Sequence, residues 1–338
     1  MPASPHRSRQ PRQSRRSGQS LKLTIVTLAA AVIAATLAAC GSAQNVPARS
    51  KLPLTNLTVG VVPVADIAPL YLGISRGFFS AQRLNVAPKQ VQQGSLIINQ
   101  VISGALDIGF SNNVSLIAAA SHGIPLRIVA AGNQAGPGLY SAIFVRAGSP
   151  IRTPQDLAGK HIAVNAVANV GPLVVNAALQ KEGVDVSKIA YVAVPFPNMA
   201  NALVKGQVDA VWAVEPFSGA ISAQSGTRRI MEPYTLLPKD FPVASYFVSS
   251  RYLSQHRSVV KKFTAAMNES LRYAQSHPAQ VRQLLPTFLK IPATVAAKVV
   301  LPEWGTNVES AQLTTTAQLA RRYGYISTVP DITQLTGG

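Results

Sequence analysis

Polar side chains follow two similar strands of this sequence, at the point where each strand ends. An order of helix, glycine turn, aspartate and apolar strand occurs at residues 99–113 and again at 201–215. Open α/β sheets bind ligands at the carboxyl ends of their strands, so the polar residues there are candidate ligand contacts. For the first copy the alternative is ordinary turn formation. The candidates are Ser111, Asn112 and Asn113 in the first copy and Glu215 in the second.

Two helix starts could offer backbone N–H groups to a ligand. The loop 165–171 leads into a predicted helix, and residues 94–95 open another. Free N–H groups and the helix dipole make such a start an anion site. The alternatives are an ordinary strand–helix loop and, for the serine, a helix N-cap, which can coexist with ligand contact. The residues predicted to contact a ligand here are Asn169, Val170, Gly171, Gly94 and Ser95.

Two acids decide which charge a ligand would carry. Asp66 precedes a short predicted helix, so it is either an N-cap or a ligand contact. Glu215 follows an apolar strand, and a carboxylate at a buried strand end needs partners, either in a ligand or in a hinge between lobes. If both acids face the cleft, they repel a bare sulfonate or nitrate, and a heterocycle or an amine becomes the better ligand.

Three aromatic residues could stack on a ring-shaped ligand. They are Tyr71, Trp212 and Tyr246. Each could equally belong to the hydrophobic core, since large aromatic side chains dominate cores as well as binding sites.

Other polar residues predict no catalytic centre. Asp107 and Asp209 follow the glycine turns of the two copies, and we expect them to brace those turns. The histidines beyond residue 40 are scattered, without the spacing of metal ligands, and no nucleotide-binding or nucleophile-elbow motif occurs. We predict no catalytic residue, no metal site and no cofactor.

The surrounding elements predict two lobes. Both halves of the chain alternate strands and helices in the order β-α-β-α-β, which is typical of a mainly parallel sheet covered by helices. A last strand near residue 246 is followed only by helices, so the chain is expected to return to the first lobe. We therefore predict an α/β protein with residues 56–145 and 246–338 in lobe 1, residues 146–245 in lobe 2, and a ligand cleft between them.

The amino terminus reads as an export segment. Residues 1–39 contain a basic region and an apolar run of 15 residues, too short to span a bilayer comfortably. The run ends in Leu37-Ala38-Ala39-Cys40, which resembles a bacterial lipobox, so Cys40 is predicted to carry lipid. An ordinary signal peptide or a weak anchor helix is the alternative. Residues 40–55 are small, polar and proline-containing, as expected of a tether.

Composition agrees with a folded extracytoplasmic protein. Hydrophobic residues make up 47% of the 338 and charged residues 13%, which excludes a disordered chain. Six of the 31 Lys and Arg residues lie in the export segment, which leaves 25 against 13 Asp and Glu. These charges are dispersed and include no nucleic-acid-binding motif, so we predict no nucleic-acid partner. Cys40 is the one cysteine, which excludes a disulfide framework.

Taken in order, several short segments resemble those of a known family. The segments are 68–72 (APLYL), 76–79 (RGFF), 103–109 (SGALDIG), 123–129 (GIPLRIV), 156–160 (DLAGK) and 206–217 (GQVDAVWAVEPF). Together they resemble the type II periplasmic-binding-protein fold. More narrowly, they resemble the solute-binding lipoproteins of nitrate, sulfonate and taurine ABC importers, which are related to fungal thiamine-pyrimidine synthases.

The resemblance implies a monomeric receptor, lipid-anchored outside the cytoplasm, that captures a small solute and delivers it to an ABC permease. Solutes of these types are sulfonates, nitrate, taurine and thiamine precursors. Two alternatives remain: an enzyme on the same fold, or a surface scaffold without a solute. The synthases depend on a cysteine-rich iron-binding motif, which this chain lacks beyond Cys40.

Overall fold

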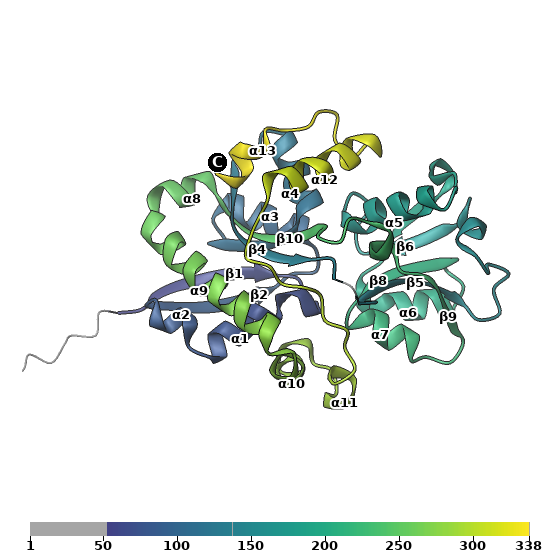
Figure 1. Ribbon diagram of the computed structural model, residues 1–338, viewed down its shortest axis with the longest axis horizontal. Helices are drawn as coiled ribbons and strands as arrows, with labels where there is room; N and C mark the ends of the chain where they lie inside the picture. The colour runs from purple at the N-terminus through teal and green to yellow at the C-terminus, as the bar shows by residue number, and fades with distance from the viewer. Residues whose placement is uncertain (1–52, 137, 338) are drawn as a thin grey trace, which may run out of the picture. The chain divides into compact units, whose positions relative to one another are not determined.

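The computed structural model describes residues 53–136 and 138–337 (Figure 1). These described residues form one compact unit. The predicted export segment and Cys40 lie outside the described residues, as does the tether up to residue 52. No helix in the described part of the chain has the length and apolarity needed to cross a membrane.

The first sheet has five strands in the order β2-β1-β3-β10-β4. β1 pairs in parallel with β2 and β3, whereas β10 runs antiparallel to both β3 and β4. β1 is buried toward its end, as its apolar run predicts. It begins at Thr55, so residue 55 belongs to the sheet and not to the predicted tether. The strands are β1 (Thr55–Val61), β2 (Leu84–Gln90), β3 (Ile108–Asn112), β4 (Leu126–Gln134) and β10 (Pro242–Ser249).

The second sheet repeats this arrangement in the order β7-β6-β8-β5-β9. β6 pairs in parallel with β7 and β8, and β5 runs antiparallel to β8 and β9. In each sheet a single strand therefore opposes the direction of the other four. The strands are β5 (Ser141–Arg146), β6 (His161–Val164), β7 (Ala190–Ala193), β8 (Ala210–Val214) and β9 (Thr227–Met231).

The two-lobed α/β prediction is confirmed, but the lobe boundaries need a correction. β5 belongs to the second sheet, although residues 141–145 were expected in lobe 1, and β10 belongs to the first sheet from residue 242. The chain therefore crosses between the sheets twice, once between β4 and β5 and once between η4 and β10. Both misplaced strands are apolar runs, which show burial but not the sheet in which they pair.

Helices cover both sheets, and the C-terminal helices return to the first lobe as expected. In the first lobe, α1 packs against α9 and α10, and α12 packs against α4. Its elements are η1 (Ala65–Ile67), α1 (Ala68–Ser75), α2 (Phe78–Ala81), α3 (Gly94–Ser103), α4 (Asn113–Ser121), α8 (Ser250–Gln255), α9 (Arg257–Ser276), α10 (Pro278–Leu289), α11 (Ala293–Ala296), α12 (Ser310–Arg322) and α13 (Ile332–Thr336). Those between the crossings are η2 (Pro154–Leu157), α5 (Val170–Lys181), η3 (Val186–Lys188), α6 (Phe196–Val204), α7 (Phe217–Ser222) and η4 (Pro233–Leu236).

In both lobes, the aspartate of the repeated pattern ties the turn that precedes its strand to a neighbouring strand. Asp107 Oδ2 accepts hydrogen bonds from Thr58 N (2.7 Å) and Thr58 Oγ1 (2.8 Å), which tie the turn before β3 to β1. Asp209 Oδ2 accepts one from His161 N (2.9 Å) and ties the turn before β8 to β6. The predicted structural role of both aspartates is confirmed.

Candidate ligand-binding site

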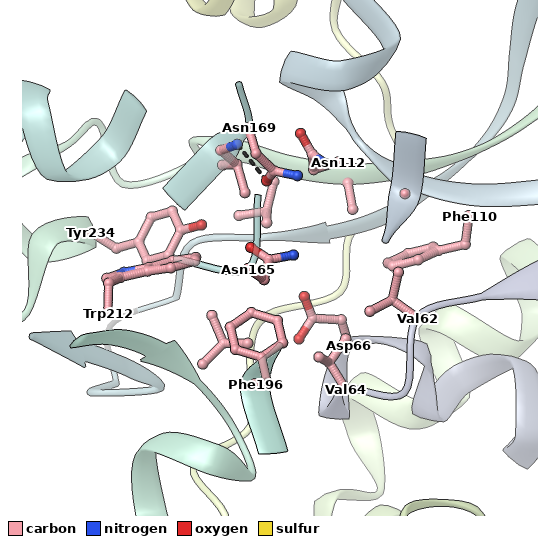
Figure 2. A pocket seen from close by; sticks show the side chains of 15 residues that line it. Val62, Val64, Asp66, Phe110, Asn112, Asn165, Asn169, Phe196, Trp212 and Tyr234 are labelled. Carbon is pink, nitrogen blue, oxygen red and sulfur yellow. Dashed lines mark hydrogen bonds between the residues drawn. The ribbon is translucent and has the colours of Figure 1, made fainter. Parts of the chain in front are cut away.

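A cavity of about 50 Å³ lies between the ends of the two sheets. A single water molecule needs roughly 10–15 Å³ of such space, so the cavity suits a few waters or a small solute. Both lobes supply its walls (Figure 2). The first contributes Val62, Val64, Asp66, Gly94, Phe110, Asn112, Val243 and Ala244, and the segments between the crossings contribute Asn165, Asn169, Val170, Phe196, Trp212, Val214 and Tyr234.

Asp66 supplies the cavity's only carboxylate among these residues. It lies in the 3₁₀ turn η1, directly after β1, and is 6% exposed. Neither η1 nor α1 has a side-chain hydrogen bond at its N-cap, so the alternative role of Asp66 as a helix cap is not realised. Figure 2 shows its carboxylate pointing toward Asn165.

The carboxyl group of Asp66 has an unusual proton affinity. Burial raises its pKa from 3.8 to about 7, because a desolvated carboxylate is unstable. A backbone N–H and the nearby amide of Asn133 oppose this shift. None of the described residues that line the cavity is Lys, Arg or His. No residue of this lining can therefore supply a positive charge to Asp66.

Aromatic rings form the wall opposite Asp66. The ring centroids of Phe196 and Trp212 lie 6.2 Å apart, and those of Trp212 and Tyr234 lie 6.5 Å apart, with interplanar angles of 50° and 55°. Glu232 fixes this wall: its Oε1 accepts from Tyr234 N (3.1 Å) and Ser141 Oγ (2.5 Å). Tilted rings of this kind suit a flat ligand held by faces and edges.

Four buried polar atoms at the cavity have no hydrogen-bond partner in the described protein. They are Asp66 Oδ1, Asn165 Oδ1, Trp212 Nε1 and Tyr234 OH. An unpaired buried polar group costs roughly 1–3 kcal/mol. Because the set contains both donors and acceptors, a ligand that offers both would satisfy it.

The start of α5 is a poorer anion site than its sequence predicts. The Asn169 side chain accepts from Val170 N (2.6 Å), and Leu173 N donates to Asn169 O (3.3 Å). The residue between Gly171 and Leu173 is a proline, which has no N–H. Of the first four positions, Gly171 alone keeps an N–H without one of these partners.

Two glycines let the helix starts approach the strands. A Cβ atom at Gly94 would lie 2.2 Å from Ser111 Oγ, and one at Gly171 would lie 2.7 Å from the Trp212 ring. Such distances are far below van der Waals contact, so no larger residue fits without a shift. Both glycines set the position of a helix start beside the cavity.

The structure brings six of the predicted contact residues to the cavity. They are Asp66, Gly94, Asn112, Asn169, Val170 and Trp212. Asn112 also caps α4, because its Oδ1 accepts from Ser115 N (2.9 Å). That these residues bind a solute remains a prediction.

The remaining predicted contacts lie elsewhere, each for a packing reason. Ser111 is fully buried beneath Gly94, and Gly171 packs on Trp212. Asn113 Nδ2 donates to Pro242 O (3.0 Å), and Ser95 is exposed to solvent. Tyr71 stacks on Phe288 and Tyr246 packs against Phe110 and Phe263, all within the first lobe.

Glu215 lies at the contact between the two lobes rather than at the cavity. It is 3% exposed, and its backbone O accepts from Ala65 N (3.0 Å) of the first lobe. Its carboxylate accepts from Gly219 N (3.3 Å) and Val300 N (3.4 Å). Burial raises its pKa from 4.5 to about 7. Of the two alternatives for this residue, the structure favours the hinge role.

Sequence reasoning missed three aromatic residues of the cavity. Phe110 occupies the position in the first copy of the repeat that Trp212 occupies in the second, so the repeat itself could have indicated it. Phe196 opens α6 and Tyr234 lies in η4, and neither carries a local signal. Among the described residues, no group of three or more His, Cys, Asp or Glu is placed to hold a metal ion.

Comparison with known proteins gives the family. The NMT1/THI5-like family profile matches residues 64–281, more than half of the chain. The chain belongs to the NMT1/THI5-like family. YtlA of Bacillus subtilis is 22% identical over 233 residues, which are 66% of this chain and 69% of YtlA.

A second protein that is similar to this chain is named as an enzyme. The 4-amino-5-hydroxymethyl-2-methylpyrimidine phosphate synthase of Candida albicans is 24% identical over 225 residues, 63% of this chain. The match spans 64% of the synthase, which is less than two thirds of its length.

Solved structures share the fold of this NMT1/THI5-like chain. The alkanesulfonate-binding protein SsuA from Xanthomonas axonopodis pv. citri, bound to MOPS, has a TM-score of 0.69 at 20% identity, covering 83% of this chain and 96% of SsuA. The nitrate-binding protein NrtA from Synechocystis has a TM-score of 0.71 at 14% identity, covering 84% and 86%. The periplasmic-binding-protein fold and the family resemblance are confirmed.

Proposed function

We propose that this protein is an extracytoplasmic solute-binding receptor that captures a small amino-substituted nitrogen heterocycle for an ABC importer. The observation that carries the solute class is the Asp66 carboxylate, which faces a cavity whose described lining contains no basic residue. Export and lipid attachment at Cys40 belong to the same proposal. We expect such a receptor to be a monomer outside the cytoplasm that delivers its solute to an ABC permease.

The chemistry of the walls favours a ring over an inorganic anion. Charged Asp66 repels an anion, and the start of α5 has few N–H groups left to attract one. A ring amino group can donate to Asp66 and Asn165, and a ring nitrogen can accept from Trp212. The pyrimidine in the name of the Candida relative carries such an amino group.

Capture would work by closure of the lobes. A ligand between Asp66 of the first lobe and the aromatic wall of the second contacts both only when they are together, so it stabilises the closed state over the open one. The cavity offers groups that bind and orient a solute.

The test is a thermal-shift panel on a chain that begins at residue 53. The probes are 4-amino-5-hydroxymethyl-2-methylpyrimidine, cytosine, adenine, taurine, ethanesulfonate and nitrate. A ligand at one hundred times its dissociation constant stabilises the protein by about 2.7 kcal/mol, which shifts the melting temperature visibly. We expect shifts from aminated rings and none from nitrate or ethanesulfonate.

Matched variants link the result to the cavity. Asp66→Asn is expected to weaken ring binding at least tenfold, since a neutral amide cannot pair with a cationic ring. Glu269→Gln, an exposed residue of α9 outside the cavity, should bind like the wild type. Shifts from sulfonate or nitrate alone would overturn the proposed solute class and leave the receptor proposal standing.

The enzyme alternative rests on the synthase relative. Its test is incubation of the purified protein with the bound solute, followed by mass spectrometry of the small molecules. Catalytic turnover would replace the receptor proposal. Recovery of the unchanged solute is the expected result.

A further inference from the structure

Helix α12 belongs to the first lobe, yet its C-terminal end lies against the second. α12 packs on α4, α13 and β10, which are all first-lobe elements. Two tyrosines follow at its end, Tyr323 and Tyr325. Figure 1 shows this end of α12 beside α5, and hydrogen bonds join them.

Tyr325 enters a partly buried hydrogen-bond chain. Its hydroxyl accepts from Asn176 Nδ2 (3.3 Å), and Asn176 Oδ1 accepts from Tyr191 OH (2.6 Å). Asn176 is 7% exposed, so its amide depends on these partners rather than on water. The chain crosses from the end of α12 through α5 to β7.

Tyr323 adds a second, exposed contact to the same helix. Its hydroxyl donates to Gln180 Oε1 (2.9 Å). Asn176 and Gln180 are four residues apart, so they lie on one face of α5. Both tyrosines therefore hold a single face of this helix.

The other end of α5 forms part of the cavity wall. Val170 and its cap Asn169 line the cavity, and Gly171 packs on Trp212. A rigid helix transmits its position along its length. Whatever holds α5 against α12 therefore also holds the wall of the second lobe near Asp66.

We propose that Tyr323, Tyr325, Asn176 and Gln180 form a tyrosine clasp that holds the lobes closed even without a ligand. The two tyrosines are then positioning residues that slow the release of a captured solute. Closure by the clasp is independent of the proposed function, whereas its effect on release rests on it.

The closure test needs no ligand. A chain that begins at residue 53 contains no cysteine, because Cys40 is the one cysteine of the sequence. Ser103→Cys in the first lobe and Glu182→Cys in the second, both exposed, accept a fluorophore pair for single-molecule energy transfer. We expect a populated closed state in the ligand-free protein.

Tyr325→Phe is expected to lower the ratio of closed to open molecules about tenfold, since it leaves a buried amide without its partner. Gln180→Ala, which removes only the exposed contact, should lower it about twofold. Gln180→Ala also spares the core, so it still tests the clasp if Tyr325→Phe folds poorly. With a solute from the thermal-shift panel, the dissociation rate should rise by similar factors.

Tyr273→Phe is the matched control. This tyrosine also donates to a glutamine, Gln280 Oε1 (3.1 Å), but both lie in the first lobe. The variant should leave the ratio unchanged. Wild-type ratios in both Tyr325→Phe and Gln180→Ala would overturn the clasp, whatever the ligand panel shows. If the variants lower the ratio of closed to open molecules but no probe of the thermal-shift panel stabilises the protein, the clasp is confirmed. Only the proposed solute class is then contradicted.

Discussion

At the scale of single residues, the position of a polar atom relative to the cavity decides its role. Tyr246 OH and Tyr234 OH are both buried without a partner, and both tyrosines are at most 3% exposed. Only Tyr234 lines the cavity. The Tyr234 hydroxyl is therefore a candidate ligand contact, whereas the buried Tyr246 hydroxyl lowers the stability of the folded protein.

This contrast gives a prediction for Tyr246→Phe. Removing an unpaired buried hydroxyl should raise the free energy of unfolding by about 1 kcal/mol, measured by urea denaturation at pH 7. Solute affinity should not change. Tyr234→Phe should gain stability in the same way but bind more weakly. Equal losses of affinity in the two variants would place Tyr246 at the site and contradict the structure.

At the scale of elements, close packing between helix starts and strands sets the cavity. α5 can lie against β8 only because Gly171 has no side chain where the Trp212 ring passes. Its capped first turn then has few donors left for an anion. The helix start therefore acts more as a wall than as an anion site.

Gly171→Ala should push α5 away from Trp212. We expect a loss of about 1–3 kcal/mol in the free energy of unfolding, as for other overpacked sites, together with weaker solute binding. Gly148→Ala is the control, because a Cβ there meets nothing within 4 Å. It should change stability by less than about 0.5 kcal/mol. If both variants behave alike, the close approach of α5 is not what shapes the site.

At the scale of the whole molecule, three buried carboxylates gather around the connection between the lobes. Burial raises the pKa of Asp66, Glu215 and Glu232 to about 7, from 3.8 for the aspartate and 4.5 for the glutamates. At a pH between the ordinary and the raised pKa values, these carboxyl groups stay protonated in the folded protein but are ionised in the unfolded chain. The free energy of unfolding must therefore fall as pH rises through this window.

We predict that the ligand-free protein melts at a lower temperature at pH 8 than at pH 5. One pKa unit corresponds to about 1.4 kcal/mol, so the combined effect reaches several kcal/mol at most. Asp66→Asn should reduce the slope, and the exposed Glu269→Gln should not. A melting temperature that stays constant between pH 5 and pH 8 would show that these carboxylates are better solvated than the structure indicates.

The sequence by itself determined the parts of this protein that depend on local pattern. The repeat with Asp107 and Asp209, the alternation of strands and helices, and the ordered short segments gave two α/β lobes and the family. These features follow from turn chemistry and hydrophobic period, which act over a few neighbouring residues. The export segment and Cys40 remain predictions of this kind.

Only the tertiary structure decided which residues share the cavity. Asp66 and Glu215 looked equivalent as acids near strand ends, yet one faces the cavity and the other lies at the contact between the lobes. Phe196 and Tyr234 reach the same space from separate elements. Such assignments depend on how two sheets and their helices pack together, and on which sheet β5 and β10 join. Hydrogen-bond pairing between distant segments sets that arrangement, and no local spacing encodes it.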